Sequence, residues 1–505
     1  MFSDLLLGFA ATLEPTSIAM IAVGTALGIF VGALPGLSSP MAIIVLLPLT
    51  YSFPTLPALM MMMGVYVGTK LGGSFSAILL RTPGTPAGAC TALDGYPMAQ
   101  RGEAGLALGY AVMGSTLGGV FGWVIAITCV PLLAAVAMKA SSADIALIGV
   151  LGLIMVTAFI RASMLRGMIG IMLGLLLSTV GIDPVDGTER FTFGSYQLQS
   201  GIPFAAALVG FFGFAVVLSD TALIGTSTQA VTQKVRLVLP KLRDVFGRWR
   251  AIVIGGAYGV GIGAIPGVGA EASPWMAYGT VRNQSRNPEA FGTGEPDGIL
   301  APEANNNAAC GGTMVPMLTL GIPGDGTTAV MLGALILHGV APGVTLMRDE
   351  PVLVWGLLAS LLVATVCMFL IAWPSITLFV RVLGKDRGWL FPFILVLATL
   401  GAFASMNDFF PVWVALGCGV LGWLLESHGF PTVTVVLGII LGPIIEQNAR
   451  LALSLSQNDW GVFVDTVPRM LIAALIVGLI AWELWRHLSK HLAAPRKQSV
   501  PHGGN

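Results

Sequence analysis

The sequence predicts an all-α, polytopic membrane protein, and three observations support this fold class. Of the 505 residues, 55% are apolar and only 10% are charged, whereas about a quarter of the residues in a soluble domain are charged. No Lys, Arg, Asp or Glu occurs from Pro15 to Thr69. Further charge-free runs cover residues 104–138, 191–219, 251–270 and 351–380. A membrane helix needs about 20 mostly apolar residues, so soluble enzymes, disulfide-stabilised secreted domains and disordered chains are excluded.

These runs predict about 11–12 transmembrane helices, together with broken or re-entrant hairpins. A β-barrel is disfavoured because its strands would alternate in hydropathy over roughly ten residues. The five cysteines are far apart and form no CxxC or Cys/His cluster, so they predict apolar packing rather than a metal site. The net charge of zero gives no indication of nucleic-acid binding.

Two basic segments divide the chain. Residues 226–250 carry six basic side chains against one acid, Asp244, and residues 487–505 form a basic tail. Short loops rich in Lys and Arg stay in the cytoplasm, so we expect both segments there, whether the first is a linker or an amphipathic helix on the membrane. No basic residue precedes Lys70, which favours an N-terminus outside. We expect residues 1–225 and 251–486 to be two transmembrane repeats.

A matched series of glycines indicates that the two repeats arose by duplication. Gly24, Gly28, Gly32 and Gly36 have counterparts 231 residues later, and Pro35 maps onto Pro266. The counterparts are Gly255, Gly259, Gly263 and Gly267. A second pair of segments follows, with Gly72-Gly73 before TPGTPAG (82–88) and Gly311-Gly312 before IPGDGTT (322–328), their spacing differing by one residue. We expect the repeats to be inverted, because the second starts beside the basic linker and nothing holds the start of the first in the cytoplasm.

Four Pro-Gly pairs predict interrupted helices, two in each repeat. They are Pro35-Gly36, Pro83-Gly84, Pro266-Gly267 and Pro323-Gly324. After the first, Ser39 is the expected N-cap and Pro40 the first helical residue, and Ser273-Pro274 repeats this pattern. A broken helix is tolerated in a membrane where it lines a cavity or is covered by protein. Its free N–H groups suit a carboxylate and its free carbonyls suit a cation, as in secondary transporters with paired interruptions.

Neutral, oxygen-rich side chains gather at the breaks, and they define the candidate site. The expected substrate-binding residues are Ser38, Ser39, Gly84, Thr85, Asn306, Asn307, Gly324, Thr327 and Arg81. The expected cation-coupling residues, for Na⁺ or H⁺, are Gly36, Gly267, Asn305, Asp325 and Thr328. Plainer roles stay open: Asp325 as an N-cap, and Asn305–Asn307 as a loop entry.

Two basic residues close to these breaks need a partner or a route to the membrane surface. Lys70 and Arg81 have three alternatives: an ion pair with Glu271 or Asp325, contact with a substrate carboxylate, or a path to the interface.

The chain has no recognisable catalytic constellation. HExxH, GxSxG, Walker A and dinucleotide-binding motifs are all absent from the sequence. We therefore expect no cofactor and no catalytic residue, and uphill transport driven by an ion or by a partner. A membrane-embedded enzyme is the alternative from another class, and it would need a catalytic His, Cys or Asp pair.

Long motifs give the sequence a clear resemblance. They are Gly32–Pro40, Gly72–Gly109, Gly263–Glu271, Ala301–Gly324 and Met331–Gly343. With these motifs in this order, the chain resembles the large membrane subunit of the tripartite tricarboxylate transporters over essentially its whole length. Lys70, Arg81, Glu271 and Asp325 depart from the small or neutral residues that this family pattern leads us to expect.

The resemblance implies a symporter for di- or tricarboxylates in the bacterial inner membrane. It also implies two partners: a small four-helix membrane subunit and a periplasmic solute-binding protein that delivers the substrate. A permease that works without a binding protein is the alternative within transport.

Overall fold

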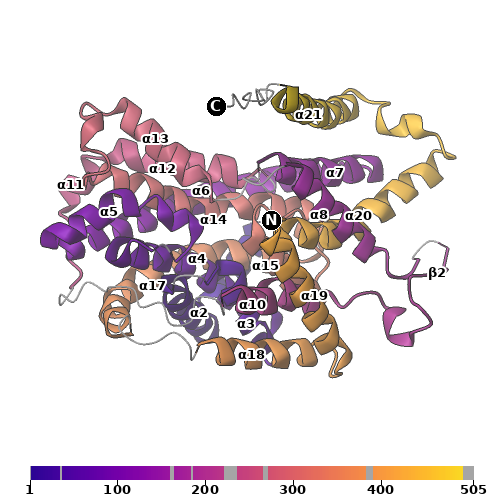
Figure 1. Cartoon of the computed structure of the whole chain (residues 1–505), viewed down its shortest axis with the longest axis horizontal. Coiled ribbons are helices and arrows are strands. Elements are labelled where there is room, and N and C mark those ends of the chain that lie inside the picture. The colour runs from indigo at the N-terminus through magenta and orange to yellow at the C-terminus, as the bar shows by residue number, and fades with distance from the viewer. Residues whose placement is uncertain are drawn as a thin grey trace, which may run out of the picture.

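The computed structural model describes residues 2–34, 37–82, 84–159, 164–183, 186–220, 236–265, 271–382 and 390–492 (Figure 1). The chain is mostly helical in these ranges, and its two short strands, β1 (Gly181–Ile182) and β2 (Glu189–Arg190), pair antiparallel. The predicted all-α class is confirmed.

The helices of the N-terminal half are α1 (Phe2–Thr12), α2 (Pro15–Ala33), α3 (Ser39–Thr50), α4 (Thr55–Leu80), η1 (Pro86–Ala89), α5 (Ala92–Met98), η2 (Ala99–Glu103), α6 (Ala104–Ala137), α7 (Ser142–Phe159), α8 (Met164–Ser178), η3 (Tyr196–Leu198), α9 (Phe204–Leu208), η4 (Val209–Phe214) and α10 (Ala215–Asp220). Those of the C-terminal half are α11 (Leu242–Phe246), α12 (Trp249–Gly263), α13 (Ser273–Gln284), η6 (Pro288–Ala290), α14 (Asp297–Leu320), α15 (Gly326–Leu337), α16 (Leu346–Asp349), α17 (Pro351–Val382), α18 (Leu390–Ala404), α19 (Phe410–Ser427), α20 (Thr432–Leu455), η7 (Trp460–Phe463) and α21 (Val467–Leu492).

Six helical segments of the described chain are long and apolar enough to cross a membrane. They are Pro15–Ala33, Thr55–Leu80, Ala92–Ala137, Pro351–Ile376, Phe410–Ser427 and Thr432–Leu455. Several apolar helices of 10–17 residues accompany them, including Gly326–Leu337 after one of the predicted breaks. The chain is therefore a multi-pass membrane protein, while the count of 11–12 spans stays a prediction.

Glycines let α2 and α4 run in direct backbone contact. A methyl group on Gly24 would lie 2.1 Å from the carbonyl oxygen of Met61, and one on Gly28 would lie 2.4 Å from that of Val65. Distances this short leave no room for any side chain, so only glycine permits this crossing. Since both residue numbers rise together along the contact, α2 and α4 are parallel.

The same crossing recurs between α12 and α14. A methyl group on Gly255 would lie 2.3 Å from the carbonyl oxygen of Ala301, and one on Gly259 would lie 2.3 Å from that of Asn305. The offset between equivalent residues is 231 from α2 to α12, as the sequence predicts, and 240 from α4 to α14.

This register corrects one detail of the predicted alignment. Gly72 packs on Ile29 and Gly312 packs on Val260, so Gly72 is equivalent to Gly312 and not to Gly311. Gly84 and Gly324 differ by the same 240 residues and pack on Gly32 and Gly263. The spacing between these landmarks is therefore identical in the two halves.

The equivalent helices α4 and α14 run antiparallel where they meet. Three contacts establish their direction: Ser74 with Glu303, the Lys70 carbonyl with Asn306, and Tyr66 with Thr313. The numbers fall along α4 as they rise along α14. Equivalent helices with opposite directions are what inverted repeats require.

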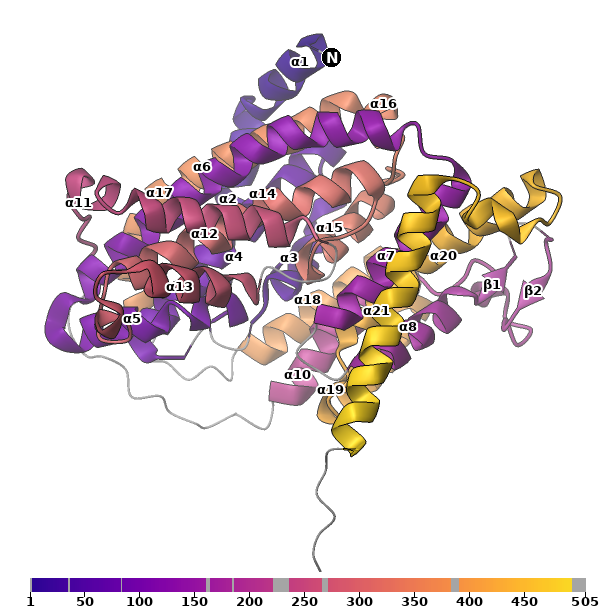
Figure 2. The same ribbon diagram turned by 90° about the horizontal axis from the view of Figure 1, so that it is seen from above.

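The two halves also interlock. Helix α6 of the first half packs on α12 and α14 of the second, while α17 of the second packs on α2 and α4 of the first. Figure 2 shows these long helices side by side. Neither half therefore completes its own packing.

Part of the expected basic linker is packed rather than free. Residues 226–235 lie outside the described part of the chain, but the N–H of Val238 donates to the carbonyl of Gly105 at the start of α6. Helix α11 and the first two residues of α12 also lie within this segment.

A polar insert, residues 281–302, is clamped by one buried acid. Asp94 Oδ1 accepts hydrogen bonds of 2.8 Å from the backbone N–H groups of Gly292, Gly294 and Glu295, and Oδ2 accepts one from Tyr278. Asp94 therefore has a structural role.

Candidate functional site

The predicted helix breaks are present in both halves. Helix α2 ends at Ala33, α4 at Leu80, α12 at Gly263 and α14 at Leu320. The structure does not describe Pro35, Gly36, Pro83, Pro266 or Gly267. Two of these residues, Gly36 and Gly267, are expected cation-coupling positions. At the first break the expected cap is wrong by one residue: α3 begins at Ser39, and Ser38 Oγ accepts from the N–H of Met41.

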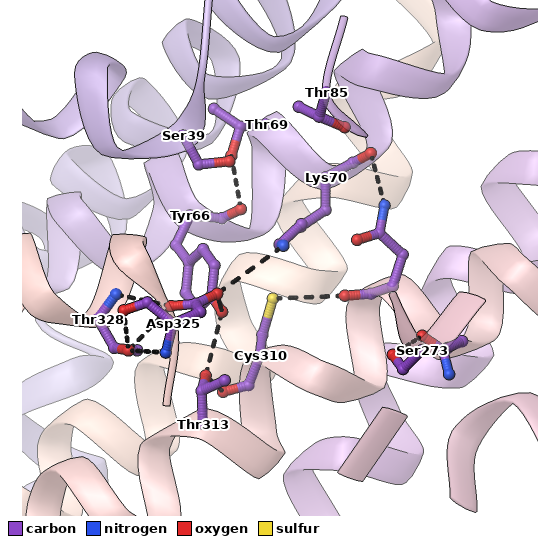
Figure 3. A network of polar contacts seen from close by, with 12 residues as sticks. Ser39, Tyr66, Thr69, Lys70, Thr85, Ser273, Cys310, Thr313, Asp325 and Thr328 are labelled. Atoms are coloured by element: carbon purple, nitrogen blue, oxygen red, sulfur yellow. Dashed lines mark hydrogen bonds and ion pairs between the residues drawn. The ribbon is translucent and has the colours of Figure 1, made fainter. Parts of the chain in front are cut away.

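The centre of the site is a charged network between the two halves (Figure 3). Lys70 Nζ on α4 lies 4.0 Å from Asp325 Oδ2, and both side chains are almost fully buried. Tyr66 donates a 2.6 Å hydrogen bond to the same carboxylate oxygen, and its hydroxyl lies 3.0 Å from Thr313 Oγ1. Of the alternatives for Lys70, the ion pair with Asp325 is the one present in the structure.

Asp325 has a second role as the N-cap of α15. Its Oδ1 accepts from the backbone N–H of Thr328, and the Thr328 hydroxyl contacts the Asp325 backbone N–H in return. This reciprocal capping fixes the carboxylate at the positive end of the helix. Lys70 is held less firmly, because 4.0 Å exceeds a charge-assisted hydrogen bond.

Three consecutive asparagines lie inside α14 rather than at a loop entry. Asn305, Asn306 and Asn307 are at most 1% exposed. Asn305 accepts from Ser273 at 2.6 Å, and Asn306 donates to the Lys70 carbonyl at 3.3 Å. Among the described residues no partner satisfies Asn305 Nδ2, Asn306 Oδ1 or either amide atom of Asn307. Buried amides without partners are costly, so this group is suited to a ligand.

The remaining hydroxyls follow the repeat. Ser39 at the start of α3 accepts from Thr69, and its equivalent Ser273 at the start of α13 donates to Asn305. Thr85 caps η1 and occupies the position equivalent to Asp325. Thr327 is buried in the first turn of α15.

Gly84 and Gly324 let two breaks approach other helices. A methyl group on Gly84 would lie 1.8 Å from the carbonyl oxygen of Gly32, and one on Gly324 would lie 2.6 Å from that of Gly263. The breaks of each half are thereby brought together.

Two of the charged candidates lie at exposed positions. Arg81 caps α4 with a left-handed backbone (φ 56°), is exposed, and lies 5.7 Å from the ring centre of Tyr96. Glu271 is exposed before α13. Arg81 is therefore exposed, whereas the other expected substrate-binding residues are buried or half-buried.

The sequence matches a known protein family. The profile described as "Tripartite tricarboxylate transporter TctA family" matches residues 18–437. The chain belongs to this family. No solved structure matches the chain.

Two relatives come from Agrobacterium vitis. The "Uncharacterized 52.8 kDa protein in TAR-I ttuC' 3'region" is 37% identical over 95% of both chains. The "Uncharacterized protein in TAR-II ttuC' 3'region" is 36% identical over 43% of this chain and 88% of its own length. Membership of the TctA family implies the large subunit of a tripartite tricarboxylate transporter.

Four residues around the candidate site could not be predicted from local sequence. Tyr66 and Thr313 lie in apolar segments, and Cys310 is the α14 equivalent of Lys70. Glu303 stands in the quoted family motif, yet only the fold shows what surrounds it. The one sequence feature that could have identified these four residues is a polar or ionisable side chain inside an apolar segment.

Proposed function

We propose that this chain is the large membrane subunit of a cation-coupled secondary importer of di- or tricarboxylates. The coupling ion in this proposal is Na⁺ or H⁺, and transport proceeds by alternating access in the bacterial inner membrane. Family membership supports the transporter class, and the buried site supports the substrate class.

The observation that carries the proposal is the pairing of Lys70 with Asp325 beside unpaired amides. An intramembrane cation marks a functional site by default. Lys70 is the buried ammonium, and Asp325 holds it at only 4.0 Å. A substrate carboxylate competes with Asp325 for Lys70, and the amide N–H groups of Asn305 and Asn307 supply further donors.

Charge balance gives the reason for ion coupling. Lys70 and Asp325 together are neutral, so a carboxylate that enters the site adds a negative charge in a buried place. A cation that enters with it removes this cost. Helices α4 and α14 are equivalent and antiparallel. In our proposal they belong to two inverted repeats that move against each other around the site during alternating access.

The proposed partners are a small four-helix membrane subunit and a periplasmic solute-binding protein. A permease that works alone is the second candidate within transport. Cells that express the large and small subunits with and without the binding protein distinguish the two. Uptake that needs no binding protein would favour the permease.

Uptake of radiolabelled citrate and of a dicarboxylate tests the proposal itself. We expect accumulation to stop when the Na⁺ gradient and the proton-motive force are both collapsed. Accumulation that continues unchanged would refute ion coupling.

Asn306→Ala and Thr85→Ala test the two halves of the site. Each should weaken uptake about tenfold to a hundredfold, because loss of one neutral hydrogen-bond partner costs about 1–3 kcal/mol. Asn283→Ala, an exposed asparagine on α13, is the matched control and should transport normally. Normal uptake by both site variants, with normal expression, would reject the assignment.

A further inference from the structure

Glu303 on α14 is a fully buried carboxylate that is surrounded by hydroxyl groups. Its exposed fraction is 0%. Ser74 and Thr91 donate to Oε1, and Ser115 donates to Oε2 at 2.7 Å. These partners come from α4, from the segment before α5, and from α6, so four separate elements converge on one point.

The other buried acids of the described chain are compensated by charge or by backbone N–H groups. Asp94 binds three backbone N–H groups and Tyr278. Asp183 lies 3.4 Å from Arg190 and 3.2 Å from Arg450. Asp325 has Lys70 and the start of α15.

Glu303 differs from all three, because the hydrogen-bond partners of its carboxylate within the described residues are neutral hydroxyls. An ionised carboxylate in a dry interior costs several kcal/mol unless a cation balances it. Hydroxyls relieve only part of this cost, and their oxygens remain free to coordinate a cation when their hydrogens turn away.

We propose that Glu303, Ser74, Thr91 and Ser115 form a Na⁺ site. Together they offer five oxygens: two from the carboxylate and three from the hydroxyls. Hard cations take several oxygen ligands of this kind. A single carboxylate balances one positive charge, which suits a monovalent cation. A transition metal or a more highly charged ion would need more His, Cys, Asp or Glu ligands, and the described residues hold no group of three such side chains.

The location connects this site to the candidate carboxylate site. Ser74 is one turn from Lys70 on α4, and Glu303 is one turn from Asn307 on α14. A cation held by Glu303 therefore lies beside the same two antiparallel helices that present Lys70 and the amides. The inference rests on the proposed function only in calling this Na⁺ the coupling ion.

Binding of ²²Na⁺ to the purified full-length chain, without any carboxylate, tests the site directly. Wild-type protein should bind ²²Na⁺ saturably, and unlabelled Na⁺ should displace it better than K⁺. Glu303→Gln should weaken binding more than about tenfold, and Ser115→Ala, which removes one neutral ligand, about tenfold. Asp297→Asn is the control: it alters an acid on the same helix that pairs with Arg248 at 3.0 Å, and it should bind as the wild type does.

The outcomes separate this inference from the proposed function. No ²²Na⁺ binding by the wild type, or equal binding by the wild type and both site variants, overturns the Na⁺ site. If Glu303→Gln does not fold, ²²Na⁺ binding by Ser115→Ala decides whether the Na⁺ site exists. Carboxylate uptake driven by protons with no Na⁺ present overturns the assignment of this Na⁺ as the coupling ion. Binding that follows the expected order in a chain that imports no carboxylate supports the Na⁺ site and refutes the transport proposal instead.

Discussion

Gly259→Ala tests whether the close crossing of α12 and α14 positions the site. The added methyl group would lie 2.3 Å from the carbonyl oxygen of Asn305 and 3.1 Å from Ala308 Cβ. Asn305 is one of the expected cation-coupling residues, and its amide oxygen accepts from Ser273 at 2.6 Å. The substitution therefore acts on the site through the backbone, without touching a polar side chain.

The size of the effect follows from these distances. Cβ atoms essentially never approach a neighbour below 3.0 Å, so the two helices must separate by about 0.7 Å, and such overpacking costs about 1–3 kcal/mol. Gly261 is the matched control on the same helix, because a methyl group there meets nothing within 4 Å. Gly261→Ala should be neutral or stabilising by up to about 1 kcal/mol, since alanine is the better helix former.

We expect the two variants to differ by about 1–4 kcal/mol in the free energy of unfolding. Denaturant titration of the purified full-length chain in detergent measures this difference, and citrate uptake in cells measures its effect on the site. Gly259→Ala should lower both stability and uptake, and Gly261→Ala neither. Equal stability of the two variants would refute the crossing geometry. Reduced stability with normal uptake would refute its link to the site.

Three further predictions concern the charged residues and the topology. Lys70→Met should destabilise the fold by a few kcal/mol, because it leaves the Asp325 carboxylate buried without its cation. The double variant Lys70→Met/Asp325→Asn should regain stability in the same titration but should not regain uptake. Normal uptake by the double variant would show that neither residue belongs to the site. Asp94→Ala should leave three backbone N–H groups unpaired and speed limited proteolysis of the polar insert, and an unchanged cleavage rate would contradict the clamp. A cysteine at Ser3 should react with an impermeant thiol reagent added outside, and one at Gln498 should not; protection of both would place the N-terminus in the cytoplasm.

Local patterns in the sequence were sufficient for the fold class and for the places where helices end. A membrane helix is recognised from the hydropathy and charge of about 20 consecutive residues. The all-α membrane class could therefore be predicted from local sequence, and the structure confirms it. The Pro-Gly pairs mark helix ends because proline lacks an N–H group and glycine is flexible. The glycines at every fourth position lie where the helices cross, as a contact stripe on one helix face requires.

The partners of the charged side chains depended on contacts between distant segments. Lys70 and Arg81 are both basic residues on or beside α4, yet one pairs with Asp325 and the other faces Tyr96. The difference arises because the antiparallel register of α4 and α14 brings Lys70 inward, whereas Arg81 lies past the end of the helix. The hydroxyl cage of Glu303 depends likewise on α4 and α6 meeting α14.

The sequence by itself therefore determined the membrane fold, the duplicated glycine pattern and the helix breaks, because each is encoded within one or two helical turns or in a constant offset. Only the tertiary structure decided the 240-residue register of α4 and α14, the pairing of Lys70 with Asp325, and the surroundings of Glu303. These depend on which helix faces cross and in which direction. Packing of residues more than 200 positions apart sets that geometry, and no local pattern encodes it.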